Sequence, residues 1–227
     1  MQTNRFIVTI DGAAGTGKTT VAQELAKRLG TDCLDTGAMY RAVALLAIEH
    51  GIDPTNGIAL SNELLQHEIT FDWEQSPPLV LLDGRDVSQK IRELEIGRVV
   101  SIVAKQPEVR TMLVKQQRKI AEHHPLMVTE GRDQGSVVFP EADARFFLVA
   151  AVDERTKRRV KQLRDSGKEV LDADVQHDLV ARDQIDSTRL DGPLLCPEGA
   201  MIIDTSELTL SDVVDAIETK VNQLLNS

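Results

Sequence analysis

Short apolar runs alternate along the chain with longer stretches in which apolar residues recur at helical spacing. The runs at residues 6–10, 32–34, 126–129, 144–150 and 200–204 are rich in aliphatic and β-branched residues and predict buried strands. Helical spacing follows at residues 19–29, 35–50, 107–121, 171–186 and 210–225. This alternation predicts an α/β fold with a central parallel sheet flanked by helices.

The pattern changes between the second strand-helix unit and the third. Residues 69–73 alternate with period two, residues 79–82 form a short apolar run, and Asp83-Gly84 predicts a hairpin turn into a third short strand. We therefore expect a small antiparallel sheet, inserted in a substrate-binding region. Phe71 and Trp73 are expected to pack this insertion. A short helix near residues 60–67 precedes it and a helix over residues 90–104 follows it.

The segment from Gly12 to Thr19 matches the phosphate-binding pattern Gly-x-x-x-x-Gly-Lys-Ser/Thr, between a predicted strand and a predicted helix. Its backbone N–H groups and the helix N-terminus are expected to hold a polyphosphate. Lys18 adds a positive charge, and the Thr19 hydroxyl is placed to bind the Mg²⁺ that accompanies a nucleoside triphosphate. The residues expected at this donor site are Gly12, Ala13, Ala14, Gly15, Thr16, Gly17, Lys18, Thr19 and Thr20.

Composition narrows the class of protein. The chain has 227 residues, which suits one domain, and its net charge of −10 argues against general binding to nucleic acids or membrane surfaces. With 41% hydrophobic but 3% aromatic residues, the core is expected to be aliphatic. We expect a cytoplasmic protein, because the sequence shows no signal peptide and no membrane span.

The metal-binding and disulfide chemistry of the side chains is expected to be limited. Cys33 and Cys196 are far apart and predict reduced thiols. The five histidines show no spacing typical of a metal site. The predicted metal ligand is Thr19, from the phosphate-binding motif.

Two charged, glycine-containing segments follow predicted strands. Residues 35–41 read Asp-Thr-Gly-Ala-Met-Tyr-Arg, and residues 130–136 read Glu-Gly-Arg-Asp-Gln-Gly-Ser. Ligands of open α/β sheets bind at the carboxyl ends of the strands, so both segments predict binding or catalytic loops. Arg41 would suit a second anion there.

Basic residues are concentrated in residues 153–164, although the protein is acidic. They indicate a lid over nucleotide phosphates, while a solvated helix face remains the alternative. Arg182, Asp183, Asp186 and Arg189 form a second charged row, for which ordinary ion pairing along a helix is the alternative.

Taken together, the glycine-rich loop, residues 35–41, residues 130–140 and the row from Arg182 to Arg189 resemble bacterial cytidylate kinases over essentially the whole chain. The resemblance implies a P-loop kinase fold and transfer of the ATP γ-phosphoryl group to CMP or dCMP, with Mg²⁺, giving ADP and CDP or dCDP. It also implies small-molecule partners only, with no nucleic acid and no membrane. The expected oligomeric state is a monomer.

The resemblance also assigns roles to single residues. Ser101, Arg110 and Asp133 would read cytosine, and Asp186 would contact the ribose. Tyr40, Arg41, Arg132 and Arg189 would hold the CMP phosphate, with Thr36 and Arg92 beside that site. The lid would contribute Arg155, Lys157, Arg158, Arg159 and Lys161, of which Arg158 would bind ATP. The residues implied in catalysis are Lys18, Arg132, Arg158 and Arg189. Departures from the family pattern are Thr36, Gln134, and lysine at positions 157 and 161.

The implied organisation is a single domain over residues 1–227. Its core would comprise residues 1–40, 100–152 and 190–227. The monophosphate-binding region with its insertion would cover about 41–104, and the lid about 153–172.

Other functions remain open at this point. The nearest is another small-molecule or nucleoside monophosphate kinase of the same fold, of UMP/CMP, AMP or shikimate type. A nucleotide-dependent switch would be expected to carry an Asn-Lys-x-Asp segment or an Asp-x-x-Gly segment after a strand, and neither occurs in the sequence. A pure binding module would show no turnover.

Overall fold

The computed structural model describes residues 5–226, so the predicted domain limits 1 and 227 lie outside the described residues. The central sheet consists of β1 (Phe6–Gly12), β2 (Asp32–Asp35), β6 (Leu126–Gly131), β7 (Ala144–Val149) and β8 (Met201–Asp204). All pairings are parallel, in the order β2-β6-β1-β7-β8. The predicted α/β fold is confirmed. Strands that follow β1 lie on both sides of it, so a crevice forms at the carboxyl ends of β1 and β6.

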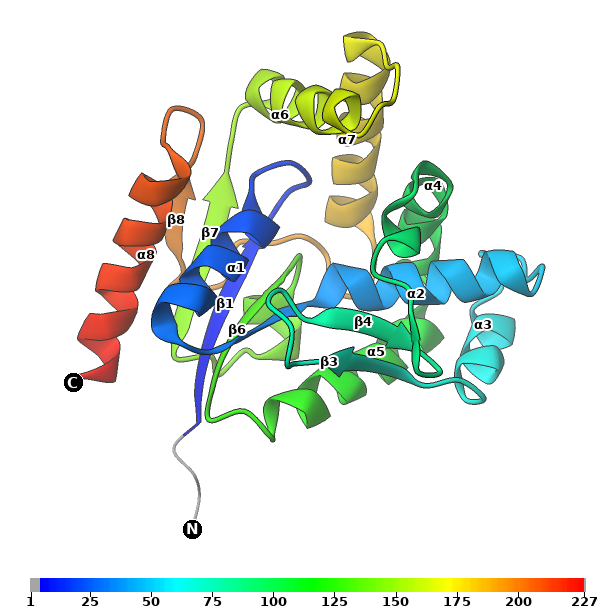
Figure 1. Ribbon diagram of the computed structural model, residues 1–227, viewed down its shortest axis with the longest axis horizontal. Coiled ribbons are helices and arrows are strands. Elements are labelled where there is room, and N and C mark those ends of the chain that lie inside the picture. Colours follow the sequence, from blue (N-terminus) through cyan, green and yellow to red (C-terminus); the bar gives the residue numbers. More distant parts are fainter. Residues whose placement is uncertain (1–4, 227) are drawn as a thin grey trace.

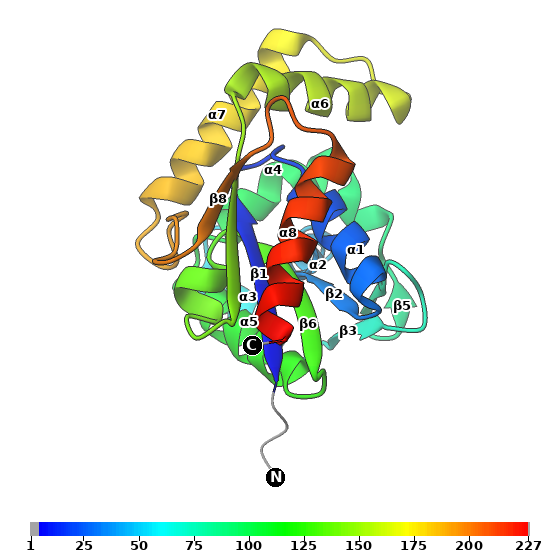
Figure 2. The same cartoon turned by 90° about the vertical axis from the view of Figure 1, so that its left-hand side faces the viewer.

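Successive residues of the central strands belong to different layers of the core. Ile7 and Met127 pack in one aliphatic cluster, whereas their neighbours Val8 and Val128 pack in another on the opposite face. Helices α1 (Lys18–Leu29) and α8 (Leu210–Leu225) cover the second face (Figure 2). Helices α2 (Thr36–Glu49) and α5 (Pro107–Ala121) supply the first cluster. Apart from Phe146 and Met39, the largest fully buried side chains among the described residues are leucine and isoleucine, which agrees with the expected aliphatic core.

The predicted insertion forms beside this core. It contains α3 (Gly57–Leu64), β3 (Ile69–Asp72), β4 (Leu79–Leu82) and β5 (Arg85–Asp86), and the three strands form an antiparallel sheet (Figure 1). Phe71 and Trp73 stack with ring centroids 5.2 Å apart and pack against the core, which confirms the expected packing role.

The prediction of a single helix over residues 90–104 is wrong. A 3-10 turn, η1 (Lys90–Arg92), is followed by Glu93 in an extended conformation, and α4 (Leu94–Val103) begins after it. The change of direction places Arg92 and Ser101 on separate elements.

Two helices, α6 (Val152–Asp165) and α7 (Asp172–Thr188), lie over the carboxyl end of the sheet (Figures 1 and 2). They pack through Val160, Leu163, Val175 and Leu179, together with Ala14 of the glycine-rich loop. The basic segment therefore lies above the predicted phosphate site.

A π-helical turn, η2 (Gln134–Val138), follows β6 and was not predicted from the sequence. The Asp11 carboxylate accepts the backbone N–H groups of Gln134 at 2.8 Å and Gly135 at 2.7 Å. Burial raises the pKa of Asp11 to about 6, although these two hydrogen bonds act to lower it. Asp11 thus attaches the charged loop after β6 to the strand that leads into the glycine-rich loop.

Local signals of the sequence agree with the element ends. Asp35 accepts the backbone N–H of Ala38 at 2.9 Å and begins α2, and Thr209 begins α8 with a capping box. Cys33 and Cys196 are both free thiols, as predicted. Every helix within residues 5–226 is either too short or too polar to cross a membrane.

Candidate active site

A cavity of about 760 Å³ opens between the glycine-rich loop, α2, α4, the end of β6 and the two overlying helices. It brings together most of the residues predicted at the site, although they come from distant parts of the sequence. The predicted residues that line it are Ala14, Gly15, Gly17, Lys18, Thr19, Thr20, Thr36, Tyr40, Arg41, Arg92, Ser101, Arg132, Asp133, Arg158, Asp186 and Arg189.

Four predicted residues, Gly12, Ala13, Thr16 and Arg110, do not line the cavity but support residues that do. Gly12 is the last residue of β1, with φ +150°, and a Cβ there would lie 2.3 Å from the carbonyl oxygen of Leu148. Thr16 is buried and its hydroxyl donates to the Ala13 carbonyl at 3.0 Å. These residues set the position and shape of the loop.

The Lys18 side chain crosses the inside of the loop. Its Nζ donates to the carbonyl oxygen of Ala13 at 2.6 Å and approaches the Thr16 hydroxyl at 3.4 Å. Burial and the nearby Arg132 guanidinium lower the pKa of Lys18. A charged ligand in the cavity would give this ammonium group the counter-charge that its surroundings only partly supply.

Thr19 and Glu130 place oxygen atoms together at the base of the cavity. The Thr19 hydroxyl donates to Glu130 Oε1 at 2.6 Å. Burial and the neighbouring Asp35 carboxylate raise the pKa of Glu130. Oxygen donors of this kind suit Mg²⁺, so the set fits the predicted ion. Glu130 was not among the predicted site residues, although it begins the charged segment after the strand.

The predicted lid arginines behave differently from one another. Arg158 lines the cavity, donates from Nη1 to the Thr205 hydroxyl at 3.0 Å, and also donates to the Thr205 carbonyl. The Thr205 hydroxyl donates to the carbonyl oxygen of Thr16 at 3.1 Å. Arg158 therefore connects α6 to the loop after β8, and Thr205 connects that loop to the glycine-rich loop.

Three other basic residues of α6, Arg155, Lys157 and Lys161, do not line the cavity. Arg155 is buried, where it donates to the Ala14 carbonyl at 3.1 Å and pairs with Asp183. Lys157 is exposed and pairs with Glu154, and Lys161 is exposed as well. These three side chains belong to the predicted lid but do not line the cavity, whereas Arg159 lines it with Arg158.

Asp133 lines the cavity and meets Arg110, which lies behind it. They form a buried ion pair, and Arg110 Nη1 also donates to the Tyr40 hydroxyl at 3.3 Å. Arg189 lies 3.8 Å from the Asp133 carboxylate and donates to the Gly192 carbonyl at 2.5 Å. Ser101 is buried and lines the same cavity. The predicted grouping of Ser101, Arg110 and Asp133 is therefore present.

Several guanidinium groups also line the cavity. Arg132 Nε donates to Asp186 Oδ2 at 2.9 Å, and Arg189 lies 3.8 Å from the same carboxylate. Arg182 also lines the cavity, and its buried Nε has no hydrogen-bond partner among the described residues. Sequence reasoning left Arg182 out of the predicted site, although its spacing from Asp186 was the available signal.

Two further arginines complete this set of cavity-lining guanidinium groups. Arg41 Nη1 donates to the Ile91 carbonyl at 3.1 Å, and burial together with Arg182 lowers the pKa of Arg41 to about 10. Arg92 is half exposed and pairs with Asp35 at 3.0 Å. Guanidinium groups held this close together in an acidic protein form an anion-binding site.

Comparison with known proteins agrees with this geometry. The family model described as cytidylate kinase matches residues 8–223. A cytidylate kinase from Caldanaerobacter subterraneus subsp. tengcongensis is 45% identical over 210 residues, covering 92% of each chain. One from Vibrio parahaemolyticus is 41% identical over 215 residues, covering 95% of each, and one from Nocardia farcinica is 40% identical over 222 residues, covering 98% of this chain and 96% of its own.

A solved structure supports the fold alone. A gluconokinase from Sinorhizobium meliloti 1021 superposes with a TM-score of 0.52 at 11% identity, covering 99% of this chain and 95% of its own. The match to the family model over nearly the whole chain, and relatives at 40% identity or more over at least 92% of it, show that this chain belongs to the cytidylate kinase family.

Proposed function

We propose that the protein transfers the γ-phosphoryl group of ATP to CMP or dCMP, producing ADP and CDP or dCDP. Membership of the cytidylate kinase family supports this proposal. The observation that carries it is the buried pair of Asp133 and Arg110, beside an arginine-lined cavity that the glycine-rich loop also lines.

Cytosine matches that pair in its hydrogen-bonding groups. The exocyclic amine of cytosine donates, which suits the Asp133 carboxylate, and its ring nitrogen and carbonyl accept, which suits Arg110 or Ser101. Uracil presents a carbonyl where cytosine presents the amine. That carbonyl would face the Asp133 carboxylate, so UMP is expected to bind less well.

The acceptor phosphate would be held by Arg41, Arg132 and Arg189, with Arg182 added from the structure. Guanidinium groups bind phosphate through paired hydrogen bonds, which fix its orientation as well as neutralise its charge. Phosphoryl transfer requires that the attacking oxygen is held in line and that the repulsion between two anions is cancelled. Asp186, bound to Arg132 at 2.9 Å, would hold one of these arginines in place.

The donor nucleotide would lie on the glycine-rich loop, with Lys18 and Arg158 against its phosphates. Thr19, together with Glu130, would hold Mg²⁺ there. When bound, the ion would neutralise charge between the phosphates. In the same proposal, residues 1–40, 100–152 and 190–227 form the core, about 41–104 bind the monophosphate, and about 153–172 form the lid. The cytoplasmic location and the monomeric state remain predictions.

A substrate panel tests the proposal directly. Initial rates with CMP, dCMP, UMP, AMP and shikimate are compared at a fixed concentration of Mg-ATP, with ADP release as the readout. CMP or dCMP should give the highest kcat/KM. A higher value for AMP or shikimate would indicate another kinase of this fold, and ATP hydrolysis that ignores all acceptors would indicate a switch.

A further inference from the structure

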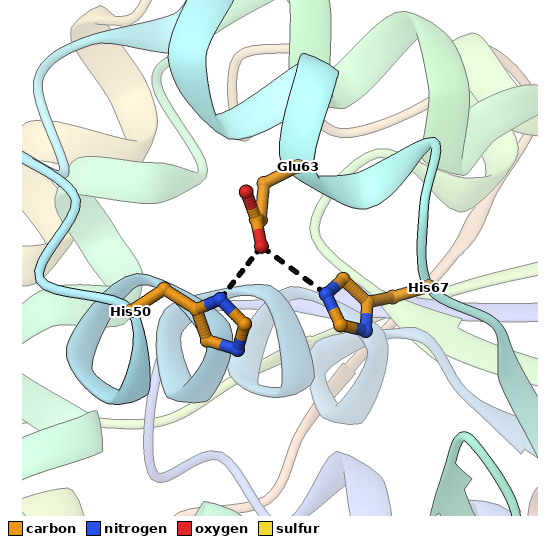
Figure 3. A group of neighbouring side chains, drawn as sticks. All are labelled: His50, Glu63 and His67. Atoms are coloured by element: carbon orange, nitrogen blue, oxygen red, sulfur yellow. Dashed lines mark hydrogen bonds and ion pairs between the residues drawn. The ribbon is translucent and has the colours of Figure 1, made fainter.

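Two histidines and a glutamate, from the end of α2 and from the insertion, converge outside the catalytic cavity. His50 ends α2, Glu63 lies in the last turn of α3, and His67 follows four residues later, before β3. Figure 3 shows both imidazole rings directed at the same Glu63 oxygen. His50 Nδ1 lies 2.7 Å and His67 Nε2 lies 3.2 Å from Glu63 Oε1, and the three ligand atoms are all within 4.8 Å of one another.

Two imidazoles and one carboxylate form the ligand set of many three-residue zinc sites. Zn–N and Zn–O distances are about 2.0–2.2 Å, so neighbouring ligand atoms around a tetrahedral ion lie about 3.3–3.5 Å apart. The present spacings of 2.7 and 3.2 Å require only a small outward movement to admit such an ion. The His50 side chain is 40% exposed, which leaves solvent access for a fourth ligand.

Asp83 provides an independent observation in favour of a metal. Its Oδ2 lies 2.6 Å from His67 Nδ1, and its Oδ1 accepts the backbone N–H of Glu68 at 2.8 Å. A hydrogen bond from Nδ1 to a carboxylate directs the lone pair of Nε2 away from Asp83, toward Glu63. Metal-binding histidines are oriented in this way by a second carboxylate. Asp83 is itself fixed at the β4–β5 turn, where its φ is +52°.

We propose that His50, Glu63 and His67 form a binding site for one divalent transition-metal ion of the zinc type, with Asp83 as a positioning residue for His67. Imidazole ligands favour zinc, cobalt, nickel or copper over magnesium and calcium. The site lies apart from the cavity that the proposed function uses, because its three ligands are not among the residues that line that cavity.

The location of the site gives the ion a structural consequence. It would join the end of α2 to α3, and through Asp83 to the hairpin of β4 and β5. Tyr40 and Arg41, in the first half of α2, line the catalytic cavity. A bound ion is therefore expected to stabilise the element that carries two acceptor-site residues.

Metal binding is tested on the full-length, untagged protein after removal of metal. Co²⁺ is titrated while visible absorption is recorded, since cobalt in a site of low coordination number absorbs far more strongly than the hydrated ion. We expect saturation at one equivalent. We also expect the thermal midpoint to rise with Zn²⁺ concentration, because the ion binds the folded state. Absence of a saturable cobalt signal, or an unchanged midpoint, would overturn the proposal.

Variants locate the site. His50→Gln and His67→Gln should each abolish the cobalt signal at one equivalent, whereas His177→Gln, on the exposed face of α7, and Cys196→Ser should retain it. Far-UV circular dichroism of each metal-free variant establishes that it is folded, and His50→Gln changes an exposed side chain at a helix end. Retention in both ligand variants, or loss in His177→Gln, would contradict the assignment.

The positioning role of Asp83 has its own readout. Asp83→Asn retains an oxygen that can accept from Glu68 but loses the charge beside His67. We expect a loss of about 10–100-fold in metal affinity with an unchanged one-to-one ratio, as found for other outer carboxylates. Unchanged affinity would remove Asp83 from the site while leaving the three ligands.

Discussion

The Arg110 guanidinium donates to the Asp133 carboxylate inside the protein, where each residue is only 3% exposed. An isolated buried charge is costly, so each member of this pair requires the other. Arg189, at 3.8 Å, adds further positive charge to the same carboxylate. The Asp133 carboxylate is therefore fixed in direction before any base arrives, so that it can accept a hydrogen bond from a donor on the base.

Asp133→Asn should shift the base preference from CMP toward UMP. The amide can donate to the uracil carbonyl that the carboxylate repels, so the ratio of kcat/KM for CMP over UMP should fall about 10–100-fold. Rates with both nucleotides measure it. Loss of the charge also leaves Arg110 buried without its counter-ion, so a thermal melt must first establish that the variant is folded. An unchanged ratio in a folded variant would remove Asp133 from base recognition.

Lys18→Met should lower kcat by about 100-fold or more while CMP affinity stays near its original value. Lys18 supplies charge to the transferred group, and groups that act on developing charge affect kcat most strongly. Steady-state kinetics and direct CMP binding separate the two effects. Lys157→Met is a matched control, because Lys157 is exposed and paired with Glu154 on the outside of α6. Equal losses in both variants would contradict a specific role for Lys18.

Arg189→Ala should weaken CMP binding more than cytidine binding. If Arg189 holds the acceptor phosphate, a ligand without a phosphate has little to lose from its removal. Calorimetric titration with the two ligands gives the comparison. Arg189 also lies near Asp133, so a partial loss for cytidine is expected. A loss of the same size for both ligands would place Arg189 at the base and not at the phosphate.

Gly12→Ala should destabilise the protein even without nucleotide. A Cβ at Gly12 would lie 2.3 Å from a backbone oxygen of β7, and the backbone has φ +150°. Neither strand can move without disturbing the parallel pairing of β1 and β7. Thermal melts of the nucleotide-free protein measure the effect.

Gly97→Ala is the matched control for that prediction. Gly97 lies within α4, and a Cβ there would meet no atom within 4 Å. Alanine is favoured over glycine in a helix by about 1 kcal/mol, so Gly97→Ala should raise the melting temperature slightly. If both substitutions shift the melt equally, the close approach of Gly12 to β7 is not what constrains this position.

The sequence predicts the elements well where one local signal decides them. The alternation of apolar runs with helical spacing locates the central sheet and its helices, and Asp83-Gly84 marks the hairpin. The sequence does not predict the backbone conformation where a contact with a distant part of the chain determines it. The turn η2 is held by Asp11, more than 120 residues earlier in the chain, and nothing in the local sequence around Gln134 reports that contact.

The candidate site shows the same division. The glycine-rich loop and the charged segment that starts at Glu130 identify about a third of the cavity-lining residues, because their motifs are contiguous. The direction of a side chain is not evident from such a local motif. Arg155 and Arg158 are three residues apart on one helix, yet Arg155 points into the packed interface and Arg158 into the cavity. The cluster of His50, Glu63 and His67 was not predicted for a related reason. The turn between α2 and α3 brings His50 close to the other two residues, and no local motif marks that contact.

Because of Thr205, the donor site can be complete only after nearly the whole chain has been synthesised. Its hydroxyl supports the backbone of the glycine-rich loop at Thr16, and Arg158 rests on it. The nucleotide cradle begins near residue 12 but receives this support only from residue 205. A nascent chain still lacking that loop has every phosphate-binding residue of the motif without the groups that brace them. Nucleotide binding during translation should therefore develop late, only when the last strand has emerged from the ribosome and joined the sheet.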